Sequence, residues 1–192
     1  MSGFELVAPP APEPPRETER TMLNRLAIRY NAVSMGATRR YVVAEHVPTT
    51  PGTWFGDRIA DAIVLDTHSA SDQEVRESGD EYRWGKSQSI HGFEIKVSRS
   101  DWLTELSDPT KAEAWAKHCH YFWLVAAERS IVRDDLPDGW GLLVPQGIAL
   151  RAVKKPKRRK PEPMSTTMIV ALGRAIQKTA SNRTNQSDGS DE

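Results

Sequence analysis

The sequence predicts an α/β protein in which helices flank a central mixed sheet. Two observations indicate this class. Segments typical of a helix, three strands, a helix and a fourth strand follow one another along the chain, and two of the strand segments are almost continuously apolar, as buried central strands are. The chain has 192 residues, 38% of them hydrophobic and 27% charged, which suits one domain with a sizeable core.

The first elements follow a proline-rich segment, residues 1–15, which we expect to be a disordered leader. A folded domain is predicted over residues 16–150. It begins with a helix that stops near Gly36, because apolar residues recur at helical spacing: Met22, Leu23, Leu26, Tyr30 and Val33. Residues 39–47 and 58–66 are predicted to be strands.

An acidic stretch, about residues 67–89, interrupts the strand pattern. It contains few apolar residues, so we expect a solvated insertion or hairpin. A strand is predicted over residues 91–97. Ser98 or Ser100 can then cap a short helical turn that reaches Leu106, and Asp108 and Pro109 are typical of the start of a helix running to about His118.

The remaining elements are two further strands, a third segment that can form a strand, and a helix. Residues 121–127 and 140–144 are predicted to be strands, and 147–153 can add one more. Residues 151–160 contain seven basic residues and no acidic ones. This basic segment and a helix at about 163–180 form a carboxyl-terminal extension, residues 151–180, and we expect residues 181–192 to be a disordered tail.

Composition limits the possible partners and compartments. The formal net charge is zero, so attraction to an anionic partner has to come from local clusters of basic residues. A single cysteine, Cys119, cannot form an internal disulfide, which favours a reducing cytoplasm. The sequence shows neither a signal peptide nor an apolar run of membrane-spanning length, so we expect no membrane partner.

The strand at residues 91–97 carries two charges that need an explanation. Side chains alternate between the faces of a strand, so Phe93, Ile95 and Val97 share one face. Glu94 and Lys96 therefore share the other face. A carboxylate beside an ammonium is costly to bury without partners, and it is also what a metal-dependent phosphodiesterase needs.

Asp61 is the best candidate for a second acid in such a site. It lies near the start of an apolar strand, where a carboxylate is costly unless it has a partner or a function. Asp61 and Glu94 can bind a hard divalent cation through oxygen ligands, and Lys96 can orient water or stabilise developing negative charge. The alternatives are structural: Glu94 and Lys96 can form a cross-strand ion pair, and Asp61 can pair with Arg58.

The order Asp61, a variable insertion, then Glu94-Ile95-Lys96 resembles the PD-(D/E)XK nuclease superfamily. The wider segments "RIADAIVL", "HGFEIKVSRSDWLTELSDPTKAEAWAKHCHYFWLVAA" and "LPDGWGLLV" are similar to bacterial and phage proteins of the MmcB-like DNA-repair type, over about residues 19–145. Two features depart from the pattern: Ala60 stands where the superfamily name has proline, and the insertion is long and acidic.

The resemblance implies a restriction-endonuclease-like core, in the order αβββαβ, that hydrolyses DNA phosphodiester bonds with Mg²⁺ or Mn²⁺. It implies that Asp61 and Glu94 bind the metal together with the backbone carbonyl of Ile95, and that Lys96 assists catalysis. A helix glutamate, Glu19, can complete the acidic cluster, and Glu45 on the first strand competes for that role. A catalytically weak or inactive DNA-binding accessory protein of the same fold is the alternative.

Several residues are candidates for contacts with DNA. The resemblance places a serine-containing turn and an early helix lysine after the catalytic strand, and the basic segment can follow a phosphate backbone. A solvated linker is an equally good explanation of the basic segment, and ordinary surface charge explains the others. The sequence does not distinguish single-stranded, duplex and branched DNA, and a homodimer is compatible with it. The candidates are Arg58, Ser98, Arg99, Lys111, Lys157, Arg158 and Arg159.

Overall fold

A computed structural model describes residues 16–31, 39–52, 58–67, 88–108 and 110–188. These residues form a six-stranded sheet in the order β1-β2-β3-β4-β5-β6. The pairs β3–β4 and β4–β5 are parallel and the other pairs are antiparallel, so the predicted mixed sheet is confirmed. The strands are β1 (Tyr41–Pro48), β2 (Ile59–Asp66), β3 (Ser89–Lys96), β4 (Tyr121–Ala126), β5 (Gly141–Gln146) and β6 (Ala149–Lys154).

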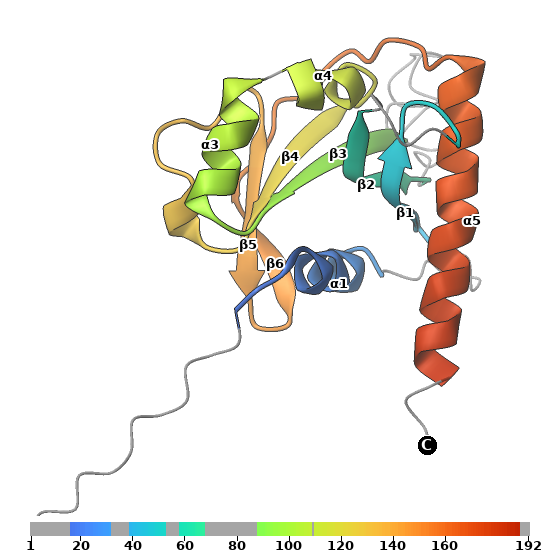
Figure 1. The fold of residues 1–192 in the computed structure, drawn as a ribbon, viewed down its shortest axis with the longest axis horizontal. Helices are drawn as coiled ribbons and strands as arrows, with labels where there is room; N and C mark the ends of the chain where they lie inside the picture. The colour runs from blue at the N-terminus through green and yellow to red at the C-terminus, as the bar shows by residue number, and fades with distance from the viewer. Residues whose placement is uncertain (1–15, 32–38, 53–57, 68–87, 109, 189–192) are drawn as a thin grey trace, which may run out of the picture.

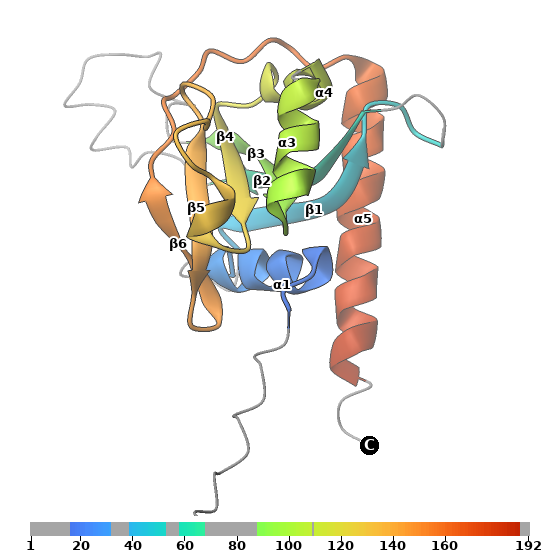
Figure 2. The same cartoon turned by 60° about the vertical axis from the view of Figure 1, so that its left-hand side comes forward.

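Helices cover both faces of the sheet, as predicted (Figure 1). The helix α1 (Glu19–Arg29) packs on one face, and α3 (Arg99–Ser107) and α4 (Thr110–Ala116) pack on the other. A long helix, α5 (Thr166–Asp188), stands beside the edge strand β1 (Figure 2). A short 3-10 helix, η2 (Arg129–Ile131), follows β4. The chain begins α1, β1, β2, β3, α3, α4 and β4, which agrees with the predicted αβββαβ order except that two helices connect β3 to β4.

The core forms where the central strands lie between these helix layers. Phe93 and Trp123 stack on the side of α1, and Phe122 meets Trp140 on the side of α3. Trp102 of α3 and Trp115 of α4 are almost completely buried there. Central strands of a parallel pair are buried on both faces, which places Glu94 and Lys96 inside the protein and not on a solvated surface.

Local signals in the sequence explain where the helices next to β3 begin and end. The Ser98 hydroxyl accepts a hydrogen bond from the backbone N–H of Asp101 at 3.2 Å, so Ser98 caps α3 as predicted. Because this cap comes two residues after Lys96, α3 starts directly above the end of β3. Thr18 caps α1, which ends at Arg29. Val33, Gly36 and Pro109 lie outside the described residues.

Helix α5 ends later than the sequence predicted. The tail expected to be disordered from residue 181 is helical up to Asp188. The segment "SNRTNQ" contains neither glycine nor proline, and the hydroxyls of Ser181 and Thr184 donate to the carbonyls of Gln177 and Ala180 within the helix. Contacts between α5 and β1 at Thr179 and Arg183 also hold this part of the helix in place.

The proline-rich leader and most of the acidic insertion, residues 68–87, lie outside the described residues. Strand β3 begins at Ser89, which the sequence assigned to the insertion. Among the described residues, no helix combines the length and the apolar character that crossing a membrane requires.

Candidate functional site

Asp61 and Glu94 lie on neighbouring strands at the point where β2 and β3 stop pairing. The last paired residues are Ala62 and Phe93, and continuing that register by one residue places Asp61 opposite Glu94 on the same face. Asp61 does not continue the ladder. Its Oδ2 atom accepts a hydrogen bond of 2.6 Å from the backbone N–H of Ile95. The two predicted metal-binding carboxylates therefore belong to one site.

Lys96 is the buried cation of this site. Its Nζ atom lies 2.7 Å from Glu94 Oε1 and 3.0 Å from Glu105 Oε2, within hydrogen-bonding distance of both. Asp101 Oδ1 lies further away, at 3.9 Å. Glu94, Lys96 and Glu105 are each only 8% exposed, so β3 and α3 enclose the ammonium between two carboxylates.

Burial and repulsion from nearby carboxylates weaken the acidity of Asp61 and Glu94. Burial raises the pKa of Glu94 to about 8, and the nearby carboxylates of Asp61 and Glu105 add to that effect, while Lys96 acts against it. Burial likewise raises the pKa of Asp61 to about 7, against the hydrogen bond from Ile95. Burial lowers the pKa of Lys96, but its contacts with Glu94 and Glu105 outweigh this, so its pKa is raised and the ammonium stays charged.

Glu19 and His46 join Asp61 at the exposed side of the site. In the β1–β2 ladder, Glu45 pairs with Ala62 and Val47 pairs with Ala60. His46 and Asp61 lie between these two pairs and therefore face each other. One ligand atom from each of Glu19, His46 and Asp61 lies within 4.8 Å of the other two. The His46 backbone has φ of 50°, a left-handed conformation that is uncommon outside glycine.

Glu45 lies on the other face of β1 and does not reach this group. Its carboxylate is buried and forms ion pairs with Arg20 of α1, at 2.8 Å, and with Arg183 of α5. Burial raises the pKa of Glu45, but the hydrogen bonds from the two arginines outweigh this and lower it below its usual range. Of the two glutamates considered from the sequence as further ligands, the structure brings Glu19 to Asp61 and not Glu45.

The Ile95 carbonyl, which the resemblance implies as a ligand, belongs to the same stretch of β3. The Ile95 N–H donates a hydrogen bond to Asp61, and this contact does not involve the carbonyl oxygen. The implied ligand role of this carbonyl therefore stays a prediction.

Two candidates for DNA contact flank the site. Arg58 precedes β2 and forms an ion pair of 3.6 Å with Asp108, between α3 and α4. Lys111 is exposed in the first turn of α4, and its backbone N–H donates to the carbonyl of Asp108. Both side chains are near enough to the surface to meet an anion without a large desolvation cost.

Two other candidates have structural partners. Arg99 donates to the carbonyl of Ile131 at 2.9 Å and pairs with Asp135 at 2.5 Å, so its guanidinium connects α3 to the segment around η2. The Ser98 hydroxyl caps α3. The prediction of a DNA contact for Arg99 overlooked this connection, because Asp135 is distant in the sequence.

The basic segment lies at the opposite end of β3 from Lys96. The Arg159 N–H donates to the carbonyl of His120, directly before β4, and the Arg158 guanidinium contacts the ring and hydroxyl of Tyr121. Tyr121 pairs with His91 at the beginning of β3, whereas Lys96 ends that strand. Lys157 pairs with Asp138 at 2.9 Å. Any DNA bound by these residues would be held away from the carboxylates.

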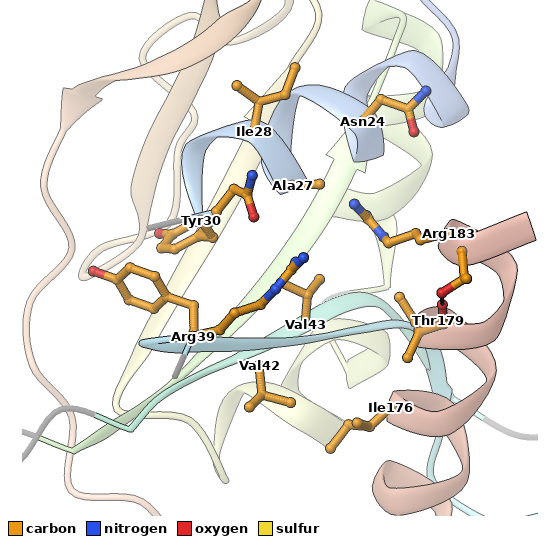
Figure 3. Close-up of a pocket in the computed structure, with 14 residues that line it drawn as sticks. Asn24, Ala27, Ile28, Tyr30, Arg39, Val42, Val43, Ile176, Thr179 and Arg183 are labelled. Atoms are coloured by element: carbon orange, nitrogen blue, oxygen red, sulfur yellow. Dashed lines mark hydrogen bonds between the residues drawn. The ribbon is translucent and has the colours of Figure 1, made fainter. Parts of the chain in front are cut away.

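A separate groove of about 680 Å³ lies between α1, β1 and α5 (Figure 3). Its walls include Ile28 and Tyr30 of α1, Val43 of β1 and Ile176 of α5, with Arg183 at one side. Neither Asp61 nor Glu94 lines it, so this groove is not the candidate site.

Sequence reasoning missed His46 and Glu105. His46 follows Glu45 directly, and only the register of β1 against β2 shows which of the two faces Asp61. Glu105 is the one charged residue among the buried positions of α3, where it accompanies Trp102. The sequence does contain a signal for Glu105. It is an acidic residue on the apolar face of the short helix that follows the strand of Lys96.

Comparisons with known proteins add support for the fold. No family model and no curated protein matches the chain. Among solved structures, a protein of unknown function from Silicibacter pomeroyi is similar, with a TM-score of 0.51 at 16% sequence identity, and the match covers 89% of each chain. A likeness at this identity concerns the fold alone. The described residues form an α/β fold with a helix-flanked, six-stranded mixed sheet, which is compatible with a restriction-endonuclease-like core.

Proposed function

We propose that this protein is a divalent-metal-dependent deoxyribonuclease of the PD-(D/E)XK type, which hydrolyses DNA phosphodiester bonds in DNA repair or processing. One observation carries the proposal: Asp61 and Glu94 share one face at the point where β2 and β3 separate, with the Lys96 ammonium 2.7 Å from Glu94. The single cysteine suits a cytoplasmic location for this activity.

The donor groups fit a divalent cation such as Mg²⁺ or Mn²⁺. The partly buried Asp61 carboxylate and the buried Glu94 carboxylate, whose pKa values are raised to about 7 and about 8, repel each other when both are ionised, and a bound cation would remove that repulsion. Glu19 and His46 supply two further ligand atoms near Asp61. Asp61 and Glu94 would hold the cation, with Glu19 and His46 completing its exposed side.

A cation held there would supply Lewis-acid chemistry, by neutralising the phosphate and making a bound water more acidic. The protein's own groups would do the rest. Asp61 is fixed by the N–H of Ile95, so its carboxylate is oriented before substrate arrives. Lys96 presents an ammonium with three donors beside Glu94, which can orient a water molecule or stabilise negative charge on the phosphate.

The substrate would approach from the side of Glu19, His46, Arg58 and Lys111. Glu19 and His46 are exposed and Arg58 is partly exposed, whereas Glu94 and Lys96 are buried behind them. Arg58 and Lys111 both lie beside Asp108 and can contact phosphates near the cleaved bond. The acidic residues of the site repel DNA until a cation is bound, so we expect metal to be needed for productive binding as well as for cleavage.

The test is an incubation of the protein with plasmid and with single-stranded DNA in Mg²⁺, Mn²⁺ or EDTA. We expect cleavage by the wild type with metal, none in EDTA, and a rate at least about 100-fold lower for Glu94→Ala and Lys96→Ala. Cleavage that persists unchanged in both variants would contradict the assignment. Tight, salt-sensitive DNA binding without any metal-dependent product would support the alternative, a DNA-binding accessory protein.

A further inference from the structure

We infer that Glu105 is a positioning residue, which holds the Lys96 ammonium in the site when Glu94 is occupied by a cation. The inference rests on the proposed function and extends it to a residue outside the Asp61, Glu94 and Lys96 set. The observation behind it is that Lys96 Nζ contacts two buried carboxylates at once, Glu94 Oε1 at 2.7 Å and Glu105 Oε2 at 3.0 Å.

The burial of Glu105 needs a functional explanation. Its side chain is only 10% exposed, and its second oxygen, Oε1, is buried without a hydrogen-bond partner among the described residues. An unsatisfied buried oxygen lowers the stability of the folded protein. The contact with Lys96 uses only Oε2, so a carboxylate at this position costs stability that the ion pair alone does not explain.

Helix α3 is fixed so that Glu105 faces Lys96. Ser98 caps the helix directly after β3, and the Trp102 indole N–H donates to Asp135 at 3.0 Å. Arg99 pairs with the same aspartate. Trp102 and Glu105 are the buried residues of α3, so the contacts that seat Trp102 also direct Glu105 toward the end of β3.

The two carboxylates have different access to a cation. Glu94 lies opposite Asp61 across the β2–β3 pair, whereas Glu105 reaches Lys96 from the helix side. A cation between Asp61 and Glu94 would compete with Lys96 for Glu94. With Glu105 present, the ammonium keeps a charged partner and stays beside the scissile phosphate. Without Glu105, it has to remain on Glu94 or leave the site.

The experiment measures Mn²⁺-dependent DNA cleavage under steady-state conditions for Glu105→Gln and for a matched control, Asp101→Asn. Asp101 belongs to the same helix and its carboxylate is also near Lys96, but at 3.9 Å it is beyond hydrogen-bonding distance. We expect Glu105→Gln to lower kcat about 10- to 100-fold, as misplacement of a catalytic group does. KM for DNA should change less than about twofold, and Asp101→Asn should lower kcat less than about threefold.

A double-mutant cycle shows whether Glu105 acts through Lys96. In a Lys96→Met background, Glu105→Gln should cause no further loss of kcat, because the group that it positions is already absent. A further loss as large as that in the wild-type background would overturn the inference and indicate that Glu105 acts directly. Glu105→Asp keeps the charge on a shorter side chain and should have a kcat between those of the wild type and Glu105→Gln. It replaces Glu105→Gln in the cycle if that variant does not fold.

The outcomes separate the inference from the proposed function. A wild type that cleaves no DNA with any metal overturns the proposed function, and the inference with it. A wild type that cleaves, with Glu105→Gln and Glu105→Asp both as active as Asp101→Asn, overturns the inference alone.

Discussion

The Asp61 carboxylate accepts a hydrogen bond of 2.6 Å from the backbone N–H of Ile95, the residue between Glu94 and Lys96. Two segments more than thirty residues apart in the chain are thus joined at one peptide group. This contact replaces the next step of the β2–β3 ladder, and it orients one carboxylate toward the strand that carries the other. The site depends on this separation of the two strands.

The first prediction concerns pH and stability without metal. The pKa of Asp61 is raised from 3.8 to about 7 and that of Glu94 from 4.5 to about 8. A raised carboxyl pKa stabilises the folded state fully below the unfolded pKa, and this stabilisation is lost as the pH rises through the folded pKa. In EDTA, the free energy of unfolding should fall between pH 5 and pH 9, by at most about 1.4 kcal/mol per pH unit for each group.

Urea denaturation at several pH values checks this prediction. The matched variant is Glu94→Gln, which removes one titrating group and should flatten the fall in stability between pH 7 and pH 9. A free energy of unfolding that rises over that range in the wild type, or an equal slope in both proteins, would contradict the origin given to the pKa shifts.

The second prediction concerns metal binding by Glu19 and His46. Thermal unfolding should shift to higher temperature when Mn²⁺ is added, because a cation that binds the folded protein stabilises it by mass action. His46→Ala and Glu19→Gln should weaken Mn²⁺ binding about tenfold. His46→Ala should affect Mg²⁺ less, since Mg²⁺ prefers oxygen ligands. Equal Mn²⁺ affinity in the wild type and both variants would exclude these two residues as ligands.

The third prediction distinguishes Glu45 from the metal ligands. Glu45→Gln removes ion pairs with Arg20 and Arg183 on the face away from Asp61, so it should lower the free energy of unfolding by about 1–3 kcal/mol. Its Mn²⁺ affinity, measured by calorimetry below the unfolding transition, should stay within about twofold of the wild type. A loss of Mn²⁺ binding equal to that of Glu19→Gln would show that Glu45 serves the metal after all.

The fourth prediction concerns the basic segment. Replacing Lys157, Arg158 and Arg159 with alanine should weaken DNA binding at low salt and reduce the slope of log affinity against log salt by at most about 3, one counterion for each charge. The rate of cleavage at saturating DNA should not change, because these residues lie at the other end of β3. An unchanged salt slope would identify the segment as a structural connection between β6 and α5.

Much of the fold and part of the site could be predicted from the sequence. Apolar runs and capping residues such as Ser98 are local signals, and they predicted the order of elements and the start of α3 correctly. Strand alternation placed Glu94 and Lys96 on one face, and Asp61 proved to lie opposite Glu94. The local predictions succeeded because each depends on residues close together in the chain, whereas the choice of Asp61 rested on the presence of an acidic residue in an apolar strand.

The rest of the site depends on tertiary contacts. Whether Glu45 or His46 faces Asp61 is decided by the register between β1 and β2, and a shift of one residue would exchange them. The position of Glu105 depends on the contact between Trp102 and Asp135, which closes a loop of more than thirty residues. Neither the β1–β2 register nor the Trp102–Asp135 contact can be predicted from a local sequence pattern. The end of α5 was predicted too early for the same reason, since Arg183 is held by Glu45 on a distant strand.

The most direct test of the metal-dependent site is anomalous diffraction from crystals of the protein grown with Mn²⁺. We predict a peak between the carboxylates of Asp61 and Glu94, with Lys96 Nζ still within hydrogen-bonding distance of Glu105 and the peak absent from crystals of Asp61→Asn. A peak at another position, or none at a Mn²⁺ concentration that supports DNA cleavage, would contradict the account.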